Sequence, residues 1–185
     1  MSKVIMTSSE MDKAISRIAF EILERNSENC EVCLIGIQRR GVNIAKLLKE
    51  KLEKLIKTEK TEIKTVNLGI LDITFYRDDL SLIAEYPVMN GTDIDFPIDK
   101  KNIILVDDVL YTGRTIRAAI DSIFEYGRPS SVGLAVLIDR GHRELPFKAD
   151  FVGKDIPTSK DEIIKVMIKE LDGKNQVEIT PVRMY

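Results

Sequence analysis

Cysteine, histidine and tryptophan are scarce in this chain of 185 residues, which has two cysteines, one histidine and no tryptophan. A structural zinc site takes about four Cys or His ligands, more than Cys30, Cys33 and His142 can supply. The cysteines form one isolated Cys-x-x-Cys pair, and Cys33 also begins the apolar run Cys33–Gly36. We therefore interpret Cys33 as a packing residue rather than a metal ligand.

Long apolar runs and an excess of charge of one sign are also absent. No apolar run approaches the roughly 20 residues that span a bilayer, and no charged N-terminal region precedes an apolar stretch. The sequence therefore predicts no membrane segment and no secretory signal, and we expect a cytoplasmic protein. Basic and acidic residues nearly cancel, at 28 against 30, so RNA binding would require a local basic patch.

Hydrophobic spacing indicates an α/β fold in one domain, residues 1–185. Thr7 and Glu10 can form a capping box that opens a helix running to about Asn26. The other expected elements are, in chain order, a strand at Val32–Gly36, a helix from Val42 to about Lys57, an extended segment at Lys64–Thr74, a buried strand from Ile103, a helix at Ile116–Phe124, a strand at Val132–Ile138, a short strand at Phe151 and Val152, and a hairpin pairing Ile163–Leu171 with Val177–Thr180. Strands that alternate with helices predict a mainly parallel, twisted central sheet flanked by helices.

Residues 103–115, with the sequence IILVDDVLYTGRT, carry the clearest chemical signal. An apolar run without polar breaks is typical of a strand buried on both faces. Asp107 and Asp108 lie at its end, where carboxylates can hold sugar hydroxyls or a hard cation such as Mg²⁺. Gly113 permits close approach of the backbone to an anion, and the helix that follows can present its first amides. The pattern predicts a sugar-phosphate site, without the Gly-x-x-x-x-Gly-Lys spacing of a triphosphate P-loop.

This stretch resembles the phosphoribosyl-pyrophosphate (PRPP) motif of type I phosphoribosyltransferases. Its wording, VDDVLYTGRT, is similar to that of the PyrR subfamily, whose members combine pyrimidine operon attenuation with uracil phosphoribosyltransferase activity. Further matching segments, in the same order, are Gly36–Gly41, Asp72–Ser81, Gly127–Ser131, Asp139–Pro146 and Ala149–Ser159. The resemblance implies the type I phosphoribosyltransferase fold, with a flexible lid at about 75–101. It also implies a small hood from the N- and C-terminal parts, the latter at about 140–185.

The resemblance implies transfer of ribose 5-phosphate from PRPP to uracil, with UMP and pyrophosphate as products. The transition state is then oxocarbenium-like, and catalysis depends on positioning and charge stabilisation rather than on a protein nucleophile. Magnesium would arrive mainly with PRPP, with Asp107 and Asp108 as candidate ligands. No organic cofactor is expected.

The same resemblance assigns residues to each part of the site. The PRPP-binding and nucleotide-binding residues are Gln38, Val106, Asp107, Asp108, Val109, Leu110, Tyr111, Thr112, Gly113, Arg114 and Thr115. The catalytic residues are Arg39 and Arg40 in the pyrophosphate loop, Tyr76 and Arg77 in the lid, and Asp107 and Asp108. The base-binding residues are Phe151 and Val152, where a ring would stack on the base. From the residues alone, two arginines before a helix also fit a solvated surface, and Phe151 with Val152 also fits a core pair.

Tyr111 departs from the general pattern of the family. Purine-using relatives commonly have an acid there that serves as a base near the purine nitrogen, and a tyrosine cannot do this at neutral pH. PyrR proteins share the tyrosine, so Tyr111 favours the pyrimidine branch over purine salvage. It also predicts slow chemistry, because no general base is evident.

PyrR proteins bind a hairpin in the leader of pyrimidine-operon mRNA when a uridine nucleotide is present. The positions that the resemblance assigns to RNA binding are Ser16, Arg17, Phe20, Arg25, Arg143, Lys148 and Lys154. Phe20 replaces a histidine and Ser16 a threonine of well-known members. An aromatic residue at this position fits base stacking, an oligomer interface or lost RNA binding. The basic residues alternatively fit a solvated face paired with Glu21, Glu24 and Glu144, and His142 fits either ligand contact or a turn.

Two functions follow as alternatives. The first is a dual protein, an RNA-binding attenuator with uracil phosphoribosyltransferase activity. Its partners would be uracil, PRPP, UMP or UTP and the leader hairpin, with no membrane. The second is a salvage enzyme without an RNA role. A phospho-accepting receiver domain is excluded, because a receiver places its paired acids near the N-terminus. The resemblance also implies a homo-oligomer, a dimer or a hexamer.

Overall fold

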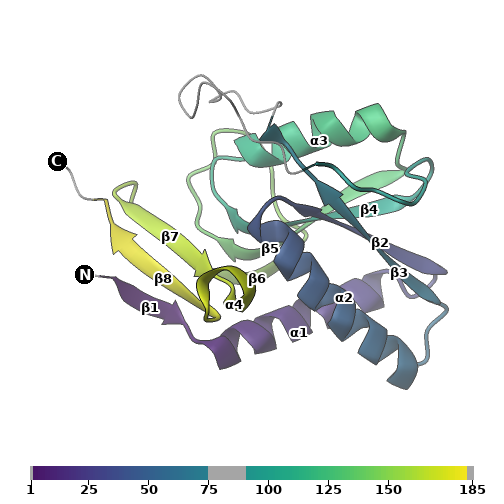
Figure 1. The fold of residues 1–185 in the computed structure, drawn as a ribbon, viewed down its shortest axis with the longest axis horizontal. Helices are drawn as coiled ribbons and strands as arrows, with labels where there is room; N and C mark the ends of the chain where they lie inside the picture. The colour runs from purple at the N-terminus through teal and green to yellow at the C-terminus, as the bar shows by residue number, and fades with distance from the viewer. Residues whose placement is uncertain (1, 75–90, 183–185) are drawn as a thin grey trace.

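The computed structural model describes residues 2–74 and 91–182 (Figure 1). In chain order they form β1 (Lys3–Met6), α1 (Ser8–Arg25), β2 (Glu31–Ile37), α2 (Arg40–Thr58), β3 (Thr65–Leu71), β4 (Asn102–Leu110), α3 (Arg114–Tyr126), β5 (Ser131–Asp139), β6 (Phe151–Asp155), β7 (Glu162–Met167), α4 (Lys169–Asp172) and β8 (Gln176–Pro181). Within these residues, no helix is long and apolar enough to cross a bilayer.

The larger sheet has five strands in the order β3-β2-β4-β5-β6, and each neighbouring pair is parallel. Alternate residues of β2 enter two separate cores, with Val32 and Leu34 in one and Cys33 and Ile35 in the other. Helices α1 and α2 cover the first core and α3 covers the second, on opposite faces of the sheet (Figure 1). The predicted parallel sheet with helices on both faces is confirmed, as is the packing role of Cys33, which is buried.

The smaller sheet is antiparallel, in the order β1-β8-β7, and lies beside the end of the larger one (Figure 1). It joins the start of the chain to its C-terminal part, as the predicted hood does. The predicted hairpin is confirmed in its pairing, since Ile163 lies opposite Thr180. Its first strand, however, ends at Met167, and α4 occupies part of the predicted strand. Strand β1 was not predicted, because only one of its four residues is buried.

Local signals set several boundaries. The Thr7 side chain accepts the N–H of Glu10 and the Glu10 carboxylate accepts the N–H of Thr7, so the predicted capping box is present. Helix α2 begins at Arg40, two residues before the predicted start. The described part of the predicted lid, residues 91–101, packs on the larger sheet. There Asp93 and Ile70 exchange backbone hydrogen bonds, and Ile98 is buried.

Candidate active site

Four loops meet at the carboxyl edge of the larger sheet. They follow β2, β4, β5 and β6, and because these strands are parallel their carboxyl ends lie at one edge. Ligands of open parallel sheets bind at this edge. The edge therefore collects the predicted phosphate loop after β4 and the predicted pyrophosphate loop after β2.

The two acids at the end of β4 are held by the backbone. Asp107 accepts the N–H of Asp108 at 2.9 Å, and Asp108 accepts the N–H of Val109 at 3.0 Å. Burial raises the pKa of Asp108, and its hydrogen bond with Asp107 and the nearby charge of Arg40 partly offset this. The pair can hold sugar hydroxyls at a fixed place.

The loop between β4 and α3 turns on Gly113. This residue has φ 94°, a left-handed conformation that favours glycine, and it directly precedes the first turn of α3. A Cβ added there would lie 3.0 Å from the Phe147 ring. The Arg114 amide donates to the Thr112 hydroxyl at 3.3 Å, which tightens the turn. The loop therefore places a compact turn at the N-terminus of a helix, the arrangement that binds phosphate.

The loop after β2 presses against β4. A Cβ on Gly41 would lie 2.4 Å from the carbonyl oxygen of Val106, so only glycine allows this contact. The Gln38–Arg39 peptide bond is cis, and the Gln38 side-chain amide (Nε2) donates to the carbonyl of Gly91 at 2.9 Å. The Arg39 side chain is exposed at this edge. The loop thus lies directly beside the acid pair.

Arg40 reaches the hood. Its Nε donates to the Val166 carbonyl at 2.7 Å, and its Nη2 pairs with Asp172 at 3.0 Å. Asp172 also accepts the N–H of Ile168 at 2.9 Å. The structure therefore gives the two predicted pyrophosphate-loop arginines different surroundings, because Arg39 is exposed and Arg40 ties the loop to β7 and α4.

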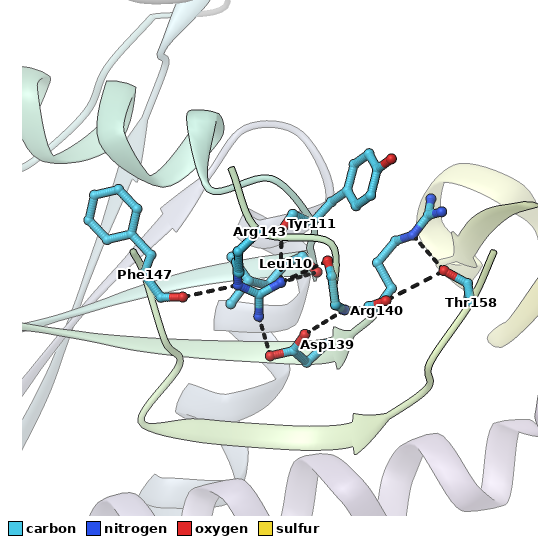
Figure 2. Close-up of polar contacts among 8 residues, drawn as sticks. Leu110, Tyr111, Asp139, Arg140, Arg143, Phe147 and Thr158 are labelled. Atoms are coloured by element: carbon cyan, nitrogen blue, oxygen red, sulfur yellow. Dashed lines mark hydrogen bonds and ion pairs between the residues drawn. The ribbon is translucent and has the colours of Figure 1, made fainter. Parts of the chain in front are cut away.

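The loop after β5 carries two arginines that face the phosphate loop (Figure 2). Arg140 is 6% exposed, and its guanidinium lies 4.1 Å from the centroid of the Tyr111 ring. Arg140 also donates to the Thr158 hydroxyl at 3.0 Å, which ties this loop to the one after β6. His142 packs edge-on against the Tyr111 ring and contacts the Thr158 carbonyl.

A cavity of about 460 Å³ lies between the loops after β5 and β6. Its lining residues are Asp139, Arg140, Gly141, His142, Arg143, Asp155, Ile156, Pro157 and Thr158. Because Arg140 and His142 both contact Tyr111, the cavity adjoins the phosphate loop. A molecule bound there would lie beside the sugar-phosphate site.

Comparison with known proteins shows the family to which the chain belongs. The phosphoribosyl transferase domain family matches residues 3–171. The bifunctional protein PyrR of Caldicellulosiruptor bescii is 56% identical, over 96% of this chain and 94% of the relative. The bifunctional protein PyrR of Clostridioides difficile is 50% identical, over 95% of this chain and 96% of the relative. The chain belongs to the PyrR family of phosphoribosyltransferases.

Solved structures agree with this PyrR family fold. The hypoxanthine phosphoribosyltransferase of Trypanosoma cruzi superposes with a TM-score of 0.70 over 97% of this chain and 96% of that chain, at 18% sequence identity. That of Staphylococcus aureus superposes with a TM-score of 0.68 over 95% and 90% of the two chains, at 16% identity. At such identity the likeness concerns the fold alone.

The predicted base-binding pair of this PyrR family member does not lie at the carboxyl edge. Phe151 begins β6, is 5% exposed and packs in the core beneath α1, with the Arg25 guanidinium 5.5 Å from its ring centroid. The Val152 carbonyl accepts a hydrogen bond from Arg17 at 2.8 Å. The core interpretation of this pair fits the packing of the ring better than stacking on a base does.

The predicted RNA-binding residues divide into exposed and internally bonded groups. Phe20 is 46% exposed, Lys148 is exposed, and the Ser16 hydroxyl donates to the Asp12 carbonyl of its own helix. The four others have protein partners: Arg17 bonds Glu21 and β6 carbonyls, Arg25 bonds Asp150, Lys154 bonds the Ile5 carbonyl, and Arg143 lies inside the site (Figure 2).

Tyr76 and Arg77, the predicted lid residues, lie outside the described residues. Sequence reasoning also missed Arg140 and Asp172, which connect the loops of the site. Arg140 had a usable signal, because it directly follows the apolar strand that ends at Asp139. Asp172 had none, because its partner Arg40 lies 132 positions away in the chain.

Proposed function

We propose that this chain is a uridine-nucleotide-dependent RNA-binding attenuator of pyrimidine biosynthesis operon transcription that also has uracil phosphoribosyltransferase activity. The observation that carries the proposal is the 56% identity to a bifunctional PyrR protein over 96% of the chain. The geometry supports it, since the acid pair, the phosphate loop and the pyrophosphate loop meet at one edge.

The enzymatic reaction joins a uracil nitrogen to the anomeric carbon of PRPP while the bond to pyrophosphate breaks. The Thr112 and Thr115 hydroxyls and the first amides of α3 bind the 5-phosphate, and Asp107 and Asp108 hold the ribose hydroxyls. Arg39, exposed beside them, neutralises charge on the departing pyrophosphate. The Arg40 guanidinium is bound to the hood, so Arg40 contributes its positive charge without contacting the pyrophosphate.

Magnesium fits this site as a companion of the substrate. It supplies charge neutralisation on the phosphate oxygens when bound. Mg²⁺ prefers oxygen ligands and commonly takes one or two carboxylates together with substrate phosphates and water. Asp107 and Asp108 supply such oxygens, and in residues 2–74 and 91–182 no group of three or more His, Cys, Asp or Glu side chains could hold a metal ion.

The uracil site that the geometry favours is the cavity between the loops after β5 and β6, in place of Phe151. It lies at the carboxyl edge and adjoins Tyr111. Its lining includes the Asp155 side chain and the His142 ring, polar groups that can meet the edge of a pyrimidine.

The RNA partner is a leader hairpin, and UMP or UTP is the effector. The exposed Phe20 and Lys148 can stack on a base and neutralise a phosphate. The side chains of Arg17, Arg25 and Lys154 are exposed as well, so each can contact a phosphate of the RNA. The proposal includes a cytoplasmic location. It also includes a homo-oligomer, a dimer or a hexamer, whose mass light scattering can measure.

The salvage enzyme without an RNA role remains the second candidate. Phe20 and the engagement of Arg17, Arg25 and Lys154 by protein groups favour it. Titration of the chain with its own leader RNA, with and without saturating UMP, separates the two. UMP should tighten binding of the leader RNA and not of a scrambled RNA. Equal dissociation constants with and without UMP would reject regulation by a uridine nucleotide. Formation of UMP from uracil and PRPP tests the enzymatic activity separately.

A further inference from the structure

Arg143 lies at the centre of the contacts between the loop after β5 and the phosphate loop (Figure 2). Its Nε donates to the Phe147 carbonyl at 3.0 Å. Its Nη1 donates to the Tyr111 carbonyl at 2.7 Å and the Gly141 carbonyl at 3.0 Å, and its Nη2 pairs with the Asp139 carboxylate. All three nitrogens of the guanidinium are thus engaged, and the side chain is only 22% exposed.

Neighbouring residues of the same loop add further hydrogen bonds to the phosphate loop. The Arg140 amide donates to the Leu110 carbonyl at 3.1 Å, and the amides of Glu144 and Leu145 each donate to the Thr112 carbonyl at 3.0 Å. Three consecutive carbonyls, that of Leu110 at the end of β4 and those of Tyr111 and Thr112 in the phosphate loop, are therefore all bound by the loop after β5.

This arrangement fixes where the amides of the phosphate loop point. In a trans peptide the carbonyl of one residue and the N–H of the next point in opposite directions, and the peptides after Tyr111 and Thr112 are trans. Holding those carbonyls towards Arg143 and Leu145 turns the amides of Thr112 and Gly113 to the other side. Successive amides aimed at one place form an anion-binding hollow.

We propose that Arg143 is a positioning residue, which orients the phosphate-binding amides of the β4–α3 loop through its bonds to Tyr111, Gly141, Phe147 and Asp139 rather than contacting RNA. This inference rests on the proposed function, because it concerns the site that binds the 5-phosphate of PRPP. The guanidinium is suited to the task, since one planar group supplies five donors in fixed directions.

Two ligands separate this role from general damage to the fold. Ribose 5-phosphate has only the phosphate that the β4–α3 loop binds, whereas magnesium pyrophosphate has only the groups that the Arg39 loop binds. Calorimetry on Arg143→Met should show ribose 5-phosphate binding weakened about tenfold, as expected for lost charged hydrogen bonds. Affinity for magnesium pyrophosphate should stay within about twofold.

Two further variants complete the test. Arg143→Lys keeps the charge but reaches fewer of the acceptors, so its affinity for ribose 5-phosphate should fall between those of Arg143→Met and the parent chain. Arg117→Met removes an exposed arginine of α3 and should bind ribose 5-phosphate like the parent chain. In steady-state assays Arg143→Met should raise KM for PRPP more than it lowers kcat.

The outcomes are distinct. If the parent chain does not bind ribose 5-phosphate, the proposed function fails. If the parent chain binds it and Arg143→Met binds it equally well, the positioning role is overturned. Equal weakening of both ligands would also overturn it, because that result indicates general damage. RNA binding gives a last check. Without UMP, Arg143→Met should bind leader RNA like the parent chain, and a loss there would mark a direct RNA contact.

Discussion

At the scale of a single residue, Tyr111 carries our prediction for the choice of base. It stands between Arg140 and His142, at the junction of the phosphate loop and the cavity after β5. A tyrosine hydroxyl does not serve as a general base for a nucleobase at neutral pH. We expect slow turnover with uracil and little with hypoxanthine or guanine, measured as pyrophosphate release from PRPP. Fast purine turnover would contradict this role of Tyr111.

Gly41 sets how closely the pyrophosphate loop approaches the acid pair. A methyl group there would lie 2.4 Å from the Val106 carbonyl and 3.1 Å from the Asp107 Cα. Gly41→Ala should therefore lower the free energy of unfolding by about 1–3 kcal/mol, as overpacking does, and should raise KM for PRPP. Urea unfolding measures the first effect.

Gly133→Ala is the matched control for this change. The added Cβ would lie 3.4 Å from the Asp150 carboxylate, which is ordinary contact. The control variant should unfold close to the parent chain. Equal destabilisation of the two variants would mean that the close approach at Gly41 is not the cause.

Residue-scale features were predictable where the partners are near in the chain. The capping box of Thr7 and Glu10 spans three positions, and the structure confirms it. Phe151 and Arg143 were not predictable in the same way, because their environments depend on α1 and on backbone carbonyls distant in the sequence. Residue type indicates that an arginine seeks acceptors, but not which acceptors the fold brings to it.

At the scale of elements, the ion pair between Arg40 and Asp172 fastens the hood to α2. The N–H of Ile168 hydrogen bonds to Asp172 and holds the pKa of its carboxyl below the usual value, and the charge of Arg40 acts in the same direction. A carboxyl with a lowered pKa in the folded state stabilises the fold above its unfolded pKa, near 3.8. That stabilisation is lost as the pH falls through the lower folded value.

Asp172→Asn should therefore be less stable than the parent chain at pH 7, and the difference should shrink below about pH 4. Chemical denaturation at several pH values measures it. Glu170→Gln is the control, because it removes an exposed carboxylate from the same short helix. Its free energy of unfolding should stay close to that of the parent chain at each pH. A constant gap between Asp172→Asn and the parent chain at every pH would contradict this account.

The boundaries of helices and strands were predictable where burial requires a pattern of apolar residues. Strand β5 is predicted at Val132–Ile138 and runs from Ser131 to Asp139, because its buried apolar run, Leu134–Ile138, is evident in the sequence and its polar end residues are not. Strand β1 has four residues, of which only Met6 is buried, so its sequence shows no burial pattern that predicts a strand. Helix α4 depends on the bond from Ile168 to Asp172, which hydrophobic spacing does not show.

At the scale of the whole molecule, the proposed function links the binding of a uridine nucleotide to the binding of RNA. If a uridine nucleotide and leader RNA bind together, each must change the affinity of the other by the same factor. We expect the factor by which UMP tightens RNA binding, measured by gel shift, to equal the factor by which RNA tightens UMP binding, measured by calorimetry. Unequal factors would exclude a single coupled complex.

Magnesium should matter to the substrate and not to the fold. Chelation should weaken PRPP binding strongly, because the metal neutralises the phosphate oxygens. The midpoint of thermal unfolding of the chain alone should be unchanged, because within the ranges that the structure describes no cluster of three or more ligating side chains holds a metal ion. A fall in that midpoint on chelation would reveal a resident metal.

The fold as a whole was predictable because the strand and helix alternation and the motif order agree with each other. The carboxyl edge was predictable for the same reason, since each motif follows a strand. The hydrogen bonds that connect the loops were not predictable. They join Arg40 to Asp172 and Arg143 to Tyr111, and they form only once the sheet has brought these residues together.

The two cysteines differ in exposure, which allows a fluorescent dye to be attached at a single site. Cys30 is exposed just before β2, at the end of the sheet opposite the phosphate loop, whereas Cys33 is buried and burial raises the pKa of its thiol. A maleimide dye at pH 7 should therefore attach at one position. The unaltered chain then carries its own reporter, remote from the loops that we propose bind PRPP.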